Sequence, residues 1–389
     1  MDEYLTNFAF GASLVCYTGA ALGCLYALVA LHAARRFVAS APIAAVENFP
    51  AVTILKPLHG AEPNLYANLT RFCEQDYPGP VQIIFGVSDR ADPAVAVVRD
   101  LMAHFPDRDL KLVTNGRDHG SNRKVSNLIN MTAEARHDVL VISDSDIAVD
   151  TDYLRHVAAS LQQPGTGIVT CLYHGVAARG VWAKLAAAAI DYHFLPSVLV
   201  GVTFRLAAPC FGSTIAIHRE TLAGIGGLQA VVDQLADDYA LGAAVRRGGL
   251  AVAIPAYSVG HECAQQSAAQ LIRHELRWAR TIRSVDPAGY TGTVVTHALP
   301  LALLGVLLGG MTPLALLAPV ALLCRAALQI EIDRAFRLRD GFYWWGPLRD
   351  LVSFAVFVAS FFGRNVEWRG HRYGVQADNT LAYYGEVET

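Results

Sequence analysis

Two long apolar stretches restrict what this chain can fold into more than any other feature of its sequence. Residues 8–32 contain no Asp, Glu, Lys or Arg, and residues 293–330 are almost continuously apolar, with breaks at Gly309-Gly310 and Pro313. About 20 apolar residues in a row are enough for a helix to cross the hydrocarbon core of a bilayer. The sequence therefore predicts an N-terminal transmembrane anchor and, further along, a tight helical hairpin across the membrane.

Basic residues follow both apolar stretches and indicate how the chain is oriented. Arg35 and Arg36 come directly after the first stretch, whereas a signal peptide would carry its positive charge first. Arg334, Arg337 and Arg339 follow the second stretch. Because Lys and Arg beside a span mark the cytoplasmic side, we expect a multi-pass protein with its large polar region in the cytoplasm.

Two shorter apolar segments leave the number of membrane helices open. Residues 194–204 are too short and too interrupted to span, so they belong to a core or lie at the membrane interface as a lipid-facing entrance, and we favour the interface. Residues 351–363 are also short, and basic residues on both sides allow a span, a tilted helix or a re-entrant loop. We therefore expect two to three C-terminal transmembrane or re-entrant helices.

Between the apolar stretches, strands alternate with helices. Amphipathic helices separate short runs rich in Val, Ile and Leu, which predict strands at residues 52–58, 81–89, 110–114 and 138–143. This β-α-β-α order is typical of a parallel, doubly wound sheet with right-handed crossovers. We expect an anchor and linker at residues 1–48, an α/β domain at residues 49–290, and a membrane region with a basic tail at residues 291–389.

The second half of the α/β domain contains weaker signals. Apolar runs predict strands at residues 167–173, 211–217 and 250–255. A helix is expected at residues 234–247, where Gly248-Gly249 ends it, and another at residues 267–283.

Asp144-Ser145-Asp146 forms the most informative polar motif. It ends a predicted buried strand, and ligands of open α/β sheets bind outside the carboxyl ends of the strands. Two carboxylates one residue apart can hold a hard divalent cation, which can in turn hold a diphosphate. The structural alternative is a strand–turn junction, where Asp and Ser are common. The functional interpretation predicts a nucleotide-sugar site.

Charge and cysteine content exclude other kinds of site. The net charge of −3 argues against nucleic acid as a partner. The seven cysteines are scattered and lack Cys-x-x-Cys spacing, so we expect neither a disulfide framework nor a zinc site. Such cysteine usage fits a reducing compartment.

Two further acidic pairs are expected at the same edge of the sheet. Asp89 and Asp92 follow the second strand, and Asp237 and Asp238 lie in the first turn of a helix. Each pair has a structural alternative, because Asp92 is a good helix N-cap and the helix dipole favours Asp in a first turn. Their common position nevertheless predicts one site.

A glycosyl transfer to an alcohol would give these acids distinct roles. Asp144 and Asp146 suit a divalent cation that neutralises the leaving diphosphate. Asp89 and Asp92 suit the nucleoside. Asp238 suits a general base that takes the proton from the acceptor hydroxyl.

Basic and aromatic residues complete the predicted site. Lys124 can reach a phosphate or a base. On the helix at residues 267–283, Arg273 and Arg277 share a basic face, and Arg277 and Trp278 suit a diphosphate and a stacking wall. A solvated surface is the usual alternative for such a stripe, but this helix leads directly into the membrane segments, so phosphate and lipid headgroups are both plausible ligands.

These motifs together resemble the processive and lipid-directed glycosyltransferases of the GT-A fold. The resemblance rests on Asp92, Asp144-Ser-Asp146, Asp237-Asp238-Tyr239 and His274-Glu-Leu-Arg277-Trp278. His274 departs from the Gln or Arg of the wider family, and the neighbouring Arg273 is a candidate substitute. The chain is more closely similar to the ceramide glucosyltransferase family, through Ile54-Leu-Lys-Pro-Leu-His-Gly60, Asp76-Tyr77-Pro78 and the layout of its membrane segments.

Within that family, the chain looks most like bacterial hopanoid-biosynthesis glycosyltransferases of the HpnI type. Three stretches carry this likeness: residues 122–130, residues 191–196 and residues 273–278. The resemblance implies a location in the bacterial inner membrane, with the catalytic domain facing the cytoplasm. It implies transfer of N-acetylglucosamine from UDP-N-acetylglucosamine to the hopanoid bacteriohopanetetrol. The alternative is a ceramide glucosyltransferase that uses UDP-glucose.

The resemblance also implies roles for individual residues. It implies an inverting transfer with Asp238 as the base beside Asp237, and a divalent cation, Mg²⁺ or Mn²⁺, at Asp144 and Asp146. His193 is similar in placement to a histidine near the acceptor site, although a core histidine fits equally well. A non-enzymatic transporter or scaffold is the remaining alternative, but the chain shows no internal repeat and retains all three acidic sets.

Overall fold

A computed structural model describes residues 2–39, 48–338, 343–363, 365–368, 371–375 and 380–386. The chain forms two compact units that interleave along the sequence. We call residues 1–40, 180–207 and 265–366 the membrane unit, and residues 41–179, 208–264 and 367–389 the sheet unit. Arg339 and most of the predicted linker, residues 40–47, lie outside the described residues. The sequence boundaries at residues 48 and 290 stay predictions.

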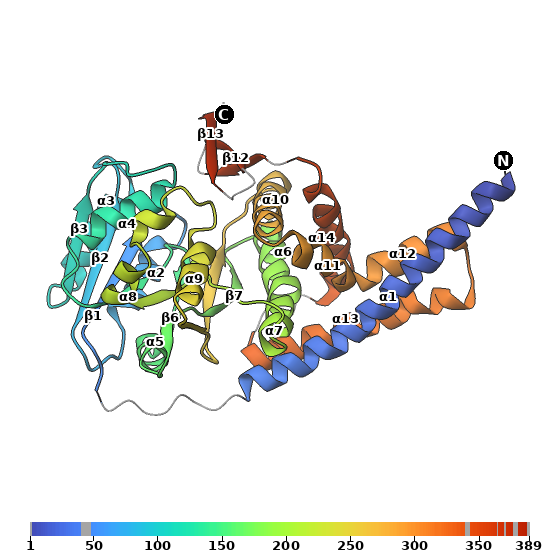
Figure 1. Ribbon diagram of the computed structural model, residues 1–389, viewed down its shortest axis with the longest axis horizontal. Helices are drawn as coiled ribbons and strands as arrows, with labels where there is room; N and C mark the ends of the chain where they lie inside the picture. The colour runs from blue at the N-terminus through green and yellow to red at the C-terminus, as the bar shows by residue number, and fades with distance from the viewer. Residues whose placement is uncertain are drawn as a thin grey trace. The chain divides into compact units, whose positions relative to one another are not determined.

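A seven-stranded sheet organises the sheet unit, in the order β3-β2-β1-β4-β8-β6-β9 (Figure 1). Its strands are β1 Val52–Pro57, β2 Val81–Val87, β3 Asp109–Thr114, β4 Val139–Ile142, β6 Thr166–Val169, β8 Ile215–His218 and β9 Ala251–Ala253. The predicted parallel half is confirmed, because β3, β2, β1 and β4 run parallel. All residues of β1 and β4 are buried, which explains their continuous apolar runs.

The strand β8 departs from the predicted parallel arrangement. It pairs antiparallel with both β4 and β6, and its first residue, Ile215, lies opposite Ile142 at the end of β4. Residues just before β8 therefore lie at the same edge as the carboxyl ends of β1 and β4. We call this edge the carboxyl edge.

Six helices belong to the sheet unit: α2 Leu65–Cys73, α3 Ala94–His104, α4 Arg123–Thr132, α5 Tyr153–Leu161, α8 Arg219–Gly224 and α9 Asp237–Arg247. A 3₁₀ turn, η2 Leu228–Val231, precedes α9. The core lies between the sheet and helices α4 and α9, where Leu55, Leu128 and Val245 belong to one buried cluster. The side chain of Asn122 caps α4 by accepting a hydrogen bond from Val125 N at 3.1 Å.

A second, three-stranded sheet continues from the Asp144–Asp146 turn. It has the order β5-β10-β7, with β5 Ile147–Ala148, β10 Ser258–Cys263 and β7 Leu172–Ala177. The predicted strand at residues 167–173 is wrong as a single element, because the chain leaves the large sheet after Val169 and enters the small one at Leu172. The strands β10, β11 Asn365–Trp368, β12 His371–Val375 and β13 Leu381–Glu386 were not predicted.

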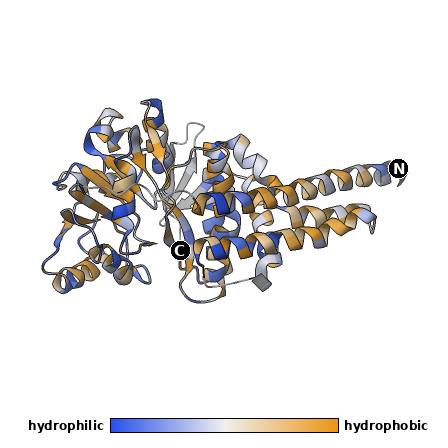
Figure 2. Cartoon of the chain, turned by 90° about the horizontal axis from the view of Figure 1, so that it is seen from below, coloured by the Kyte–Doolittle hydropathy of each residue, from blue (hydrophilic) through white to orange (hydrophobic). Residues whose placement is uncertain are grey.

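Three long apolar helices form the core of the membrane unit: α1 Asp2–Val38, α12 Ala298–Gly309 and α13 Leu317–Phe336. They lie side by side in Figure 1 and are hydrophobic along most of their length in Figure 2. Glycines allow α1 and α12 to pack closely, since a Cβ on Gly305 would lie 2.8 Å from Tyr17 and one on Gly23 would lie 2.6 Å from Ala298. The predicted helical hairpin corresponds to α12, the turn η4 Pro313–Leu316, and α13.

The membrane unit also contains shorter helices. They are α6 Val181–Ala189, the π-helical turn η1 Ile190–Phe194, α7 Leu195–Thr203, α10 Ala268–Val285, α11 Pro287–Gly292, η3 Thr293–Thr296, η5 Tyr343–Trp345 and α14 Gly346–Ser360. Among the described residues, three helices are long and apolar enough to cross a membrane: Thr6–Val38, Val181–Thr203 and Pro313–Phe336. The bent pair Pro287–Thr296 and Ala298–Gly309 adds a fourth if it counts as one span.

Two expectations about short apolar segments change as a result. Residues 194–204 were expected to be too short to span, but they continue α6 through a π-helical turn into a helix of 23 residues. Conversely, α14 has 15 residues, fewer than the roughly 20 that a span needs, and it is not among the candidate spans.

Candidate active site

Carboxylates and one lysine gather at the carboxyl edge of the sheet unit. Asp144 and Asp146 follow β4, and Lys124 lies in the first turn of α4. The Nζ atom of Lys124 lies 2.7 Å from Asp144 Oδ1 and 3.7 Å from Asp237 Oδ2. Lys124 therefore joins two of the acidic pairs that the sequence separates by about a quarter of the chain.

Asp237 and Asp238 begin α9 in different environments. Asp237 is buried and accepts a 3.4 Å hydrogen bond from the side-chain amide of Asn122. Asp238 is half-buried, and its two carboxylate oxygens accept hydrogen bonds of 2.7 Å from the backbone N–H groups of Gly212 and Tyr239. Asp238 is therefore the more accessible of the two carboxylates.

Gly212 lies at the centre of this cluster. A Cβ added to it would lie 3.0 Å from Asp144 Oδ2, 3.1 Å from Lys124 Nζ and 3.4 Å from Asp238 Oδ2. Sequence reasoning missed this residue, because it placed Gly212 inside a strand at residues 211–217, whereas β8 begins at Ile215. The only available signal was a glycine directly before a strand, which is weak.

Burial and charge set the proton affinities of the cluster. Burial and the neighbouring Asp237 raise the pKa of Asp238 to about 6. Burial also raises the pKa of Asp237. Burial acts to lower the pKa of Lys124, but Asp144, Asp237 and Asp238 outweigh it and raise that pKa. A carboxyl that titrates near 6 has the proton affinity that a general base needs at neutral pH.

The Asp144–Asp146 pair fits a divalent cation. Both side chains are about one-third exposed, at 34% and 35%. Asp146 Oδ2 lies 3.5 Å from His261 Nε2, while Asp146 Oδ1 is buried and has no hydrogen-bond partner among the described residues. No group of three or more His, Cys, Asp or Glu side chains in the described part of the chain could hold a metal alone. This combination suits Mg²⁺ or Mn²⁺, which one or two carboxylates usually hold together with water and substrate phosphates.

Asp89 and Asp92 follow β2 but have different environments. Asp92 accepts hydrogen bonds from Gly60 N at 3.0 Å and from Ala94 N at 2.8 Å, so it caps α3 and fastens the loop after β1. Asp89 is exposed, and its carboxylate accepts a 2.9 Å bond from Ala91 N. Asp89 therefore has more carboxylate surface open to a ligand than Asp92.

Tyr173 and His261 are a further pair that sequence reasoning missed. They come from the neighbouring strands β7 and β10, and their ring centroids lie 5.5 Å apart. The negative charges of Asp238, Asp146 and Asp144 act on the buried Tyr173 hydroxyl and, together with burial, raise its pKa well above its usual value. Both aromatic residues therefore border the carboxylate cluster.

The remaining predicted site residues belong to the membrane unit, where α10 carries Arg273, His274, Arg277 and Trp278. The rings of His274 and Trp278 lie 4.8 Å apart. Arg280, further along the same helix, donates to the backbone carbonyls of Asn365 at 2.7 Å and Phe362 at 3.0 Å. The motif residues thus share one helix, but Arg280 has a structural role.

His193 lies in a buried polar cluster of the membrane unit. Its Nε2 atom lies 2.9 Å from Asp350 Oδ1 and 3.1 Å from Arg325 Nη2, and Arg325 also pairs with Asp350 at 2.8 Å. Its Nδ1 atom is buried without a hydrogen-bond partner among the described residues. His193 is therefore held by charged partners on one side of its ring.

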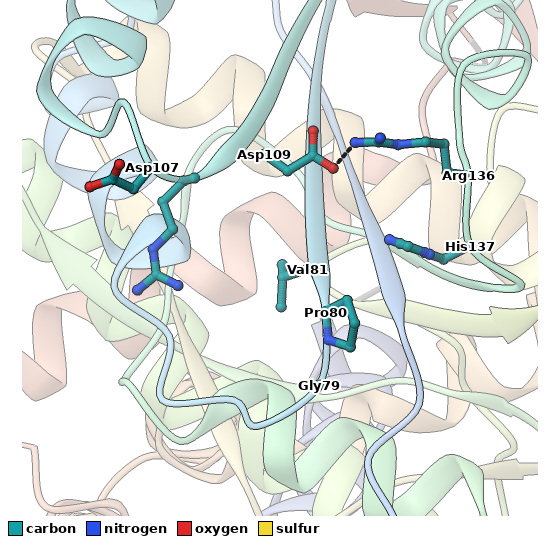
Figure 3. Close-up of a pocket in the computed structure, with 8 residues that line it drawn as sticks. Gly79, Pro80, Val81, Asp107, Asp109, Arg136 and His137 are labelled. Carbon is teal, nitrogen blue, oxygen red and sulfur yellow. Dashed lines mark hydrogen bonds and ion pairs between the residues drawn. The ribbon is translucent and has the colours of Figure 1, made fainter.

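A hollow elsewhere on the sheet unit has no predicted site residue (Figure 3). It has a volume of about 400 Å³ and lies where β2 and β3 begin, next to Val81 and Asp109. The ion pair between Arg136 and Asp109 crosses it. The carboxylate cluster at the opposite edge is the better candidate, because acids that follow β4 and acids that begin α9 converge there on Lys124.

Comparisons with known proteins point to one family. The model of glycosyl transferase family 21 matches residues 15–381. The chain is 25% identical over 232 residues to ceramide glucosyltransferase 1 of Caenorhabditis elegans, an alignment that covers 59% of this chain and 49% of that protein. It is 33% identical over 127 residues to ceramide glucosyltransferase of Candida albicans, covering 30% of this chain and 23% of that protein. The chain thus spans about half or less of the length of these relatives.

Among solved structures, the fold is similar to a mannosyltransferase from Pyrobaculum calidifontis in complex with GDP-Man and Mn²⁺. The TM-score is 0.52 with 20% identity, over 90% of this chain and 99% of that chain. At this identity the likeness bears on the fold alone.

Proposed function

Because this chain belongs to glycosyl transferase family 21, we propose that it transfers a sugar from a UDP-sugar to the hydroxyl group of a membrane lipid. Its mixed α/β sheet unit has the GT-A fold, and its membrane unit contains helices of spanning length. One observation carries the proposal: Asp144, Asp237 and Asp238 converge on Lys124 at the carboxyl edge of the sheet. Ligands of open α/β sheets bind at that edge.

In the proposed site, Asp144 and Asp146 hold a divalent cation together with the diphosphate of the donor. The uncompensated Asp146 Oδ1 supports this assignment. Such a cation neutralises negative charge on the leaving diphosphate. Asp89 is the better candidate for the nucleoside, since Asp92 already fastens the loop after β1. Lys124 keeps Asp144 and Asp237 in place and contributes positive charge beside the phosphates.

Asp238 is the proposed general base. It takes the proton from the lipid hydroxyl while that oxygen forms a bond to the anomeric carbon, and the bond from this carbon to the diphosphate breaks. UDP leaves, and the configuration at the anomeric carbon inverts. The half-buried position of Asp238 and its pKa of about 6 support this role over Asp237, which is buried and held by Asn122.

We assign the residues of α10 to the donor as well. Arg277 binds the diphosphate and Trp278 provides a stacking wall, while His274 occupies the first position of the motif and the neighbouring Arg273 is the candidate substitute for it. The ring contact between His274 and Trp278 at 4.8 Å supports a joint role for these two side chains.

The acceptor is proposed to be ceramide, with UDP-glucose as the donor. The named relatives from Caenorhabditis elegans and Candida albicans support this choice. Bacteriohopanetetrol with UDP-N-acetylglucosamine is the second candidate, favoured by residues 122–130, 191–196 and 273–278. In either case His193 is assigned to the acceptor, because its buried Nδ1 atom has a free hydrogen-bonding position.

We place the protein in the bacterial inner membrane, with the sheet unit on the cytoplasmic side. Arg35 and Glu331 are 2.8 Å apart, so the C-terminal ends of α1 and α13 lie together. Both ends carry basic residues, Arg36 after α1's apolar stretch and Arg334 near the end of α13. Basic residues on one side support a cytoplasmic location of that side.

A donor–acceptor matrix tests the proposal. Detergent-solubilised protein is incubated with UDP-glucose or UDP-N-acetylglucosamine and with ceramide or bacteriohopanetetrol, and the product mass is measured. A hexose on ceramide supports the main proposal, and an N-acetylhexosamine on the hopanoid selects the second candidate. Neither product together with no UDP binding would overturn the transferase assignment. Asp144→Ala serves as the matched negative control, since it removes one proposed cation ligand.

A further inference from the structure

Lys56 is a buried lysine that the proposed mechanism does not use. It lies in β1 and its side chain is fully buried, with 0% exposure. Its ammonium group lies 3.8 Å from the centroid of the Phe72 ring. Burying an amine without hydrogen-bond partners destabilises the folded state, so the groups that Lys56 contacts indicate its role.

The partners of Lys56 belong to the turn that carries the two cation-binding aspartates. Lys56 Nζ donates to the backbone carbonyl of Asp144, and it lies 3.4 Å from the Oγ atom of Ser143. It forms no ion pair with a carboxylate among the described residues. Lys56 therefore contacts the backbone of the turn, which leaves the carboxylate of Asp144 available to other ligands.

The strand geometry explains why this contact is needed. β1 and β4 pair in parallel, with Leu55 opposite Ile142, and Ser143 N donates to Leu55 O at 3.2 Å. Asp144 comes two residues after Ile142, the last residue of β4, so its carbonyl lies past the paired strand residues. The side chain of Lys56 donates a hydrogen bond to this carbonyl.

We propose that Lys56 is a positioning residue for the Asp144–Asp146 turn, which fixes the direction in which the two carboxylates point. This inference rests on the proposed function, because it assumes that the two carboxylates hold a cation with the donor diphosphate. An amine donates an N–H in either protonation state, so the role does not depend on the charge of Lys56.

A purely electrostatic role makes the opposite prediction. A positive charge beside the carboxylates repels a divalent cation, so its removal would tighten cation binding. Loss of a positioning contact weakens it, and residues that orient metal ligands are typically worth about 10- to 100-fold in metal affinity. The sign of the change therefore separates the two roles.

The test compares Lys56→Met and Lys56→Gln with the wild type in the full-length, detergent-solubilised protein. Both variants are neutral and similar in size, but only Gln keeps an N–H donor. The loss of the free Mn²⁺ signal in electron paramagnetic resonance, at saturating UDP, gives the Mn²⁺ affinity. We expect about tenfold weaker binding for Lys56→Met and a smaller loss for Lys56→Gln. Lys111→Met, which removes an exposed partner of Glu134, is the matched control and should bind like the wild type.

The outcomes separate this inference from the proposed function. If the wild type shows no UDP-dependent Mn²⁺ binding, the proposed cation site itself is wrong. If the wild type binds but Lys56→Met binds equally well or more tightly, only the positioning role is overturned. Thermal unfolding of each variant checks that it is folded. If Lys56→Met does not fold, the sign of the change in Lys56→Gln decides the matter: Mn²⁺ binding equal to or weaker than that of the wild type supports positioning, and tighter binding contradicts it.

Discussion

The two units of this protein both bury charged side chains, but they balance them differently. In the sheet unit, Asp144, Asp237 and Asp238 surround one lysine, Lys124. In the membrane unit, two buried arginines each bind a carboxylate. Arg349 binds both carboxylate oxygens of Glu275 at 2.8 and 2.6 Å, and Arg325 binds Asp350 at 2.8 Å.

This difference separates a ligand site from a structural contact. A bidentate pair satisfies both partners and leaves nothing for a ligand to neutralise. Several carboxylates close together repel one another and destabilise the folded state unless a cation or a proton neutralises part of their charge. The raised pKa of Asp238 reflects this repulsion together with burial. We therefore expect substitutions in the sheet unit to change function first, and those at the membrane-unit pairs to change stability first.

The largest expected effect is the loss of turnover in Asp238→Asn. Removal of a general base lowers kcat by roughly 100- to 10,000-fold. Since Asn at this position avoids the cost of an ionised buried carboxylate, the melting temperature at pH 7 should not fall. UDP-sugar binding should stay close to that of the wild type, as measured by calorimetry.

The matched control for this prediction is Asp233→Asn, the same exchange five positions earlier. Asp233 accepts hydrogen bonds from the backbone and side chain of Ser121, at 2.7 and 2.9 Å, and has no proposed part in catalysis. It should keep near wild-type turnover. Loss of UDP binding together with turnover in Asp238→Asn would move Asp238 from the role of base to a structural or cation-binding role.

The second largest effect is expected for Arg349→Met in the membrane unit. Arg349 is only 2% exposed and also contacts Ser353 and the backbone of Leu185. Its removal leaves Glu275, whose side chain is only 12% exposed, without this partner, and breaking such a pair typically costs up to about 3–5 kcal/mol of the free energy of unfolding. Thermal or denaturant unfolding in detergent measures this loss.

A double variant sharpens the same experiment. Replacing both partners, Arg349→Met with Glu275→Met, removes the uncompensated charge and should recover most of the lost stability. If the double variant is as unstable as Arg349→Met alone, the pair is not the reason for the loss. The membrane unit would then depend on Arg349 through its contacts with Leu185 and Ser353 instead.

The parallel part of the fold follows from the sequence, because its strands are buried on both faces. β1 and β4 are buried throughout and β4 is entirely apolar, and a polar motif at the end of such a strand has only one edge of the sheet to occupy. Asp144 and Asp146 could be placed there without a structure. The apolar helices α1 and α13 were equally clear, since spanning length is a property of a continuous segment.

The rest of the site depends on contacts between distant segments, which local patterns do not encode. Gly212 reaches the site only because β8 runs antiparallel to β4, with Ile215 opposite Ile142. Tyr173 and His261 approach it through the pairing of β7 with β10, two strands that lie far apart in the sequence. Likewise, the segment at residues 194–204 seemed too short to span because the π-helical turn hides its continuity with α6.

A smaller effect is expected from pH. The pKa of Asp238 is about 6 in the folded protein, above its usual value of 3.8. A base must be deprotonated to act, so kcat/KM should be constant above about pH 7 and fall about tenfold per pH unit well below pH 6. Because the folded pKa is the higher one, the stabilising contribution of Asp238 is complete below about pH 4 and is lost as the pH rises through 6. A pH–rate profile with its acid limb near pH 4 would contradict the assignment.

The smallest expected effect comes from a membrane-unit pair whose arginine is exposed. Arg35 and Glu331 are 2.8 Å apart, but the Arg35 side chain is 60% exposed. An ion pair with an exposed arginine contributes little to stability, because water and salt screen it. Arg35→Met should therefore shift the melting temperature in detergent far less than Arg349→Met, and added salt should reduce the difference further. If Arg35→Met and Arg349→Met lower the melting temperature equally, burial of the arginine does not determine which ion pairs stabilise this unit. The contrast between its balanced pairs and the acidic cluster of the sheet unit would then rest on the functional results alone.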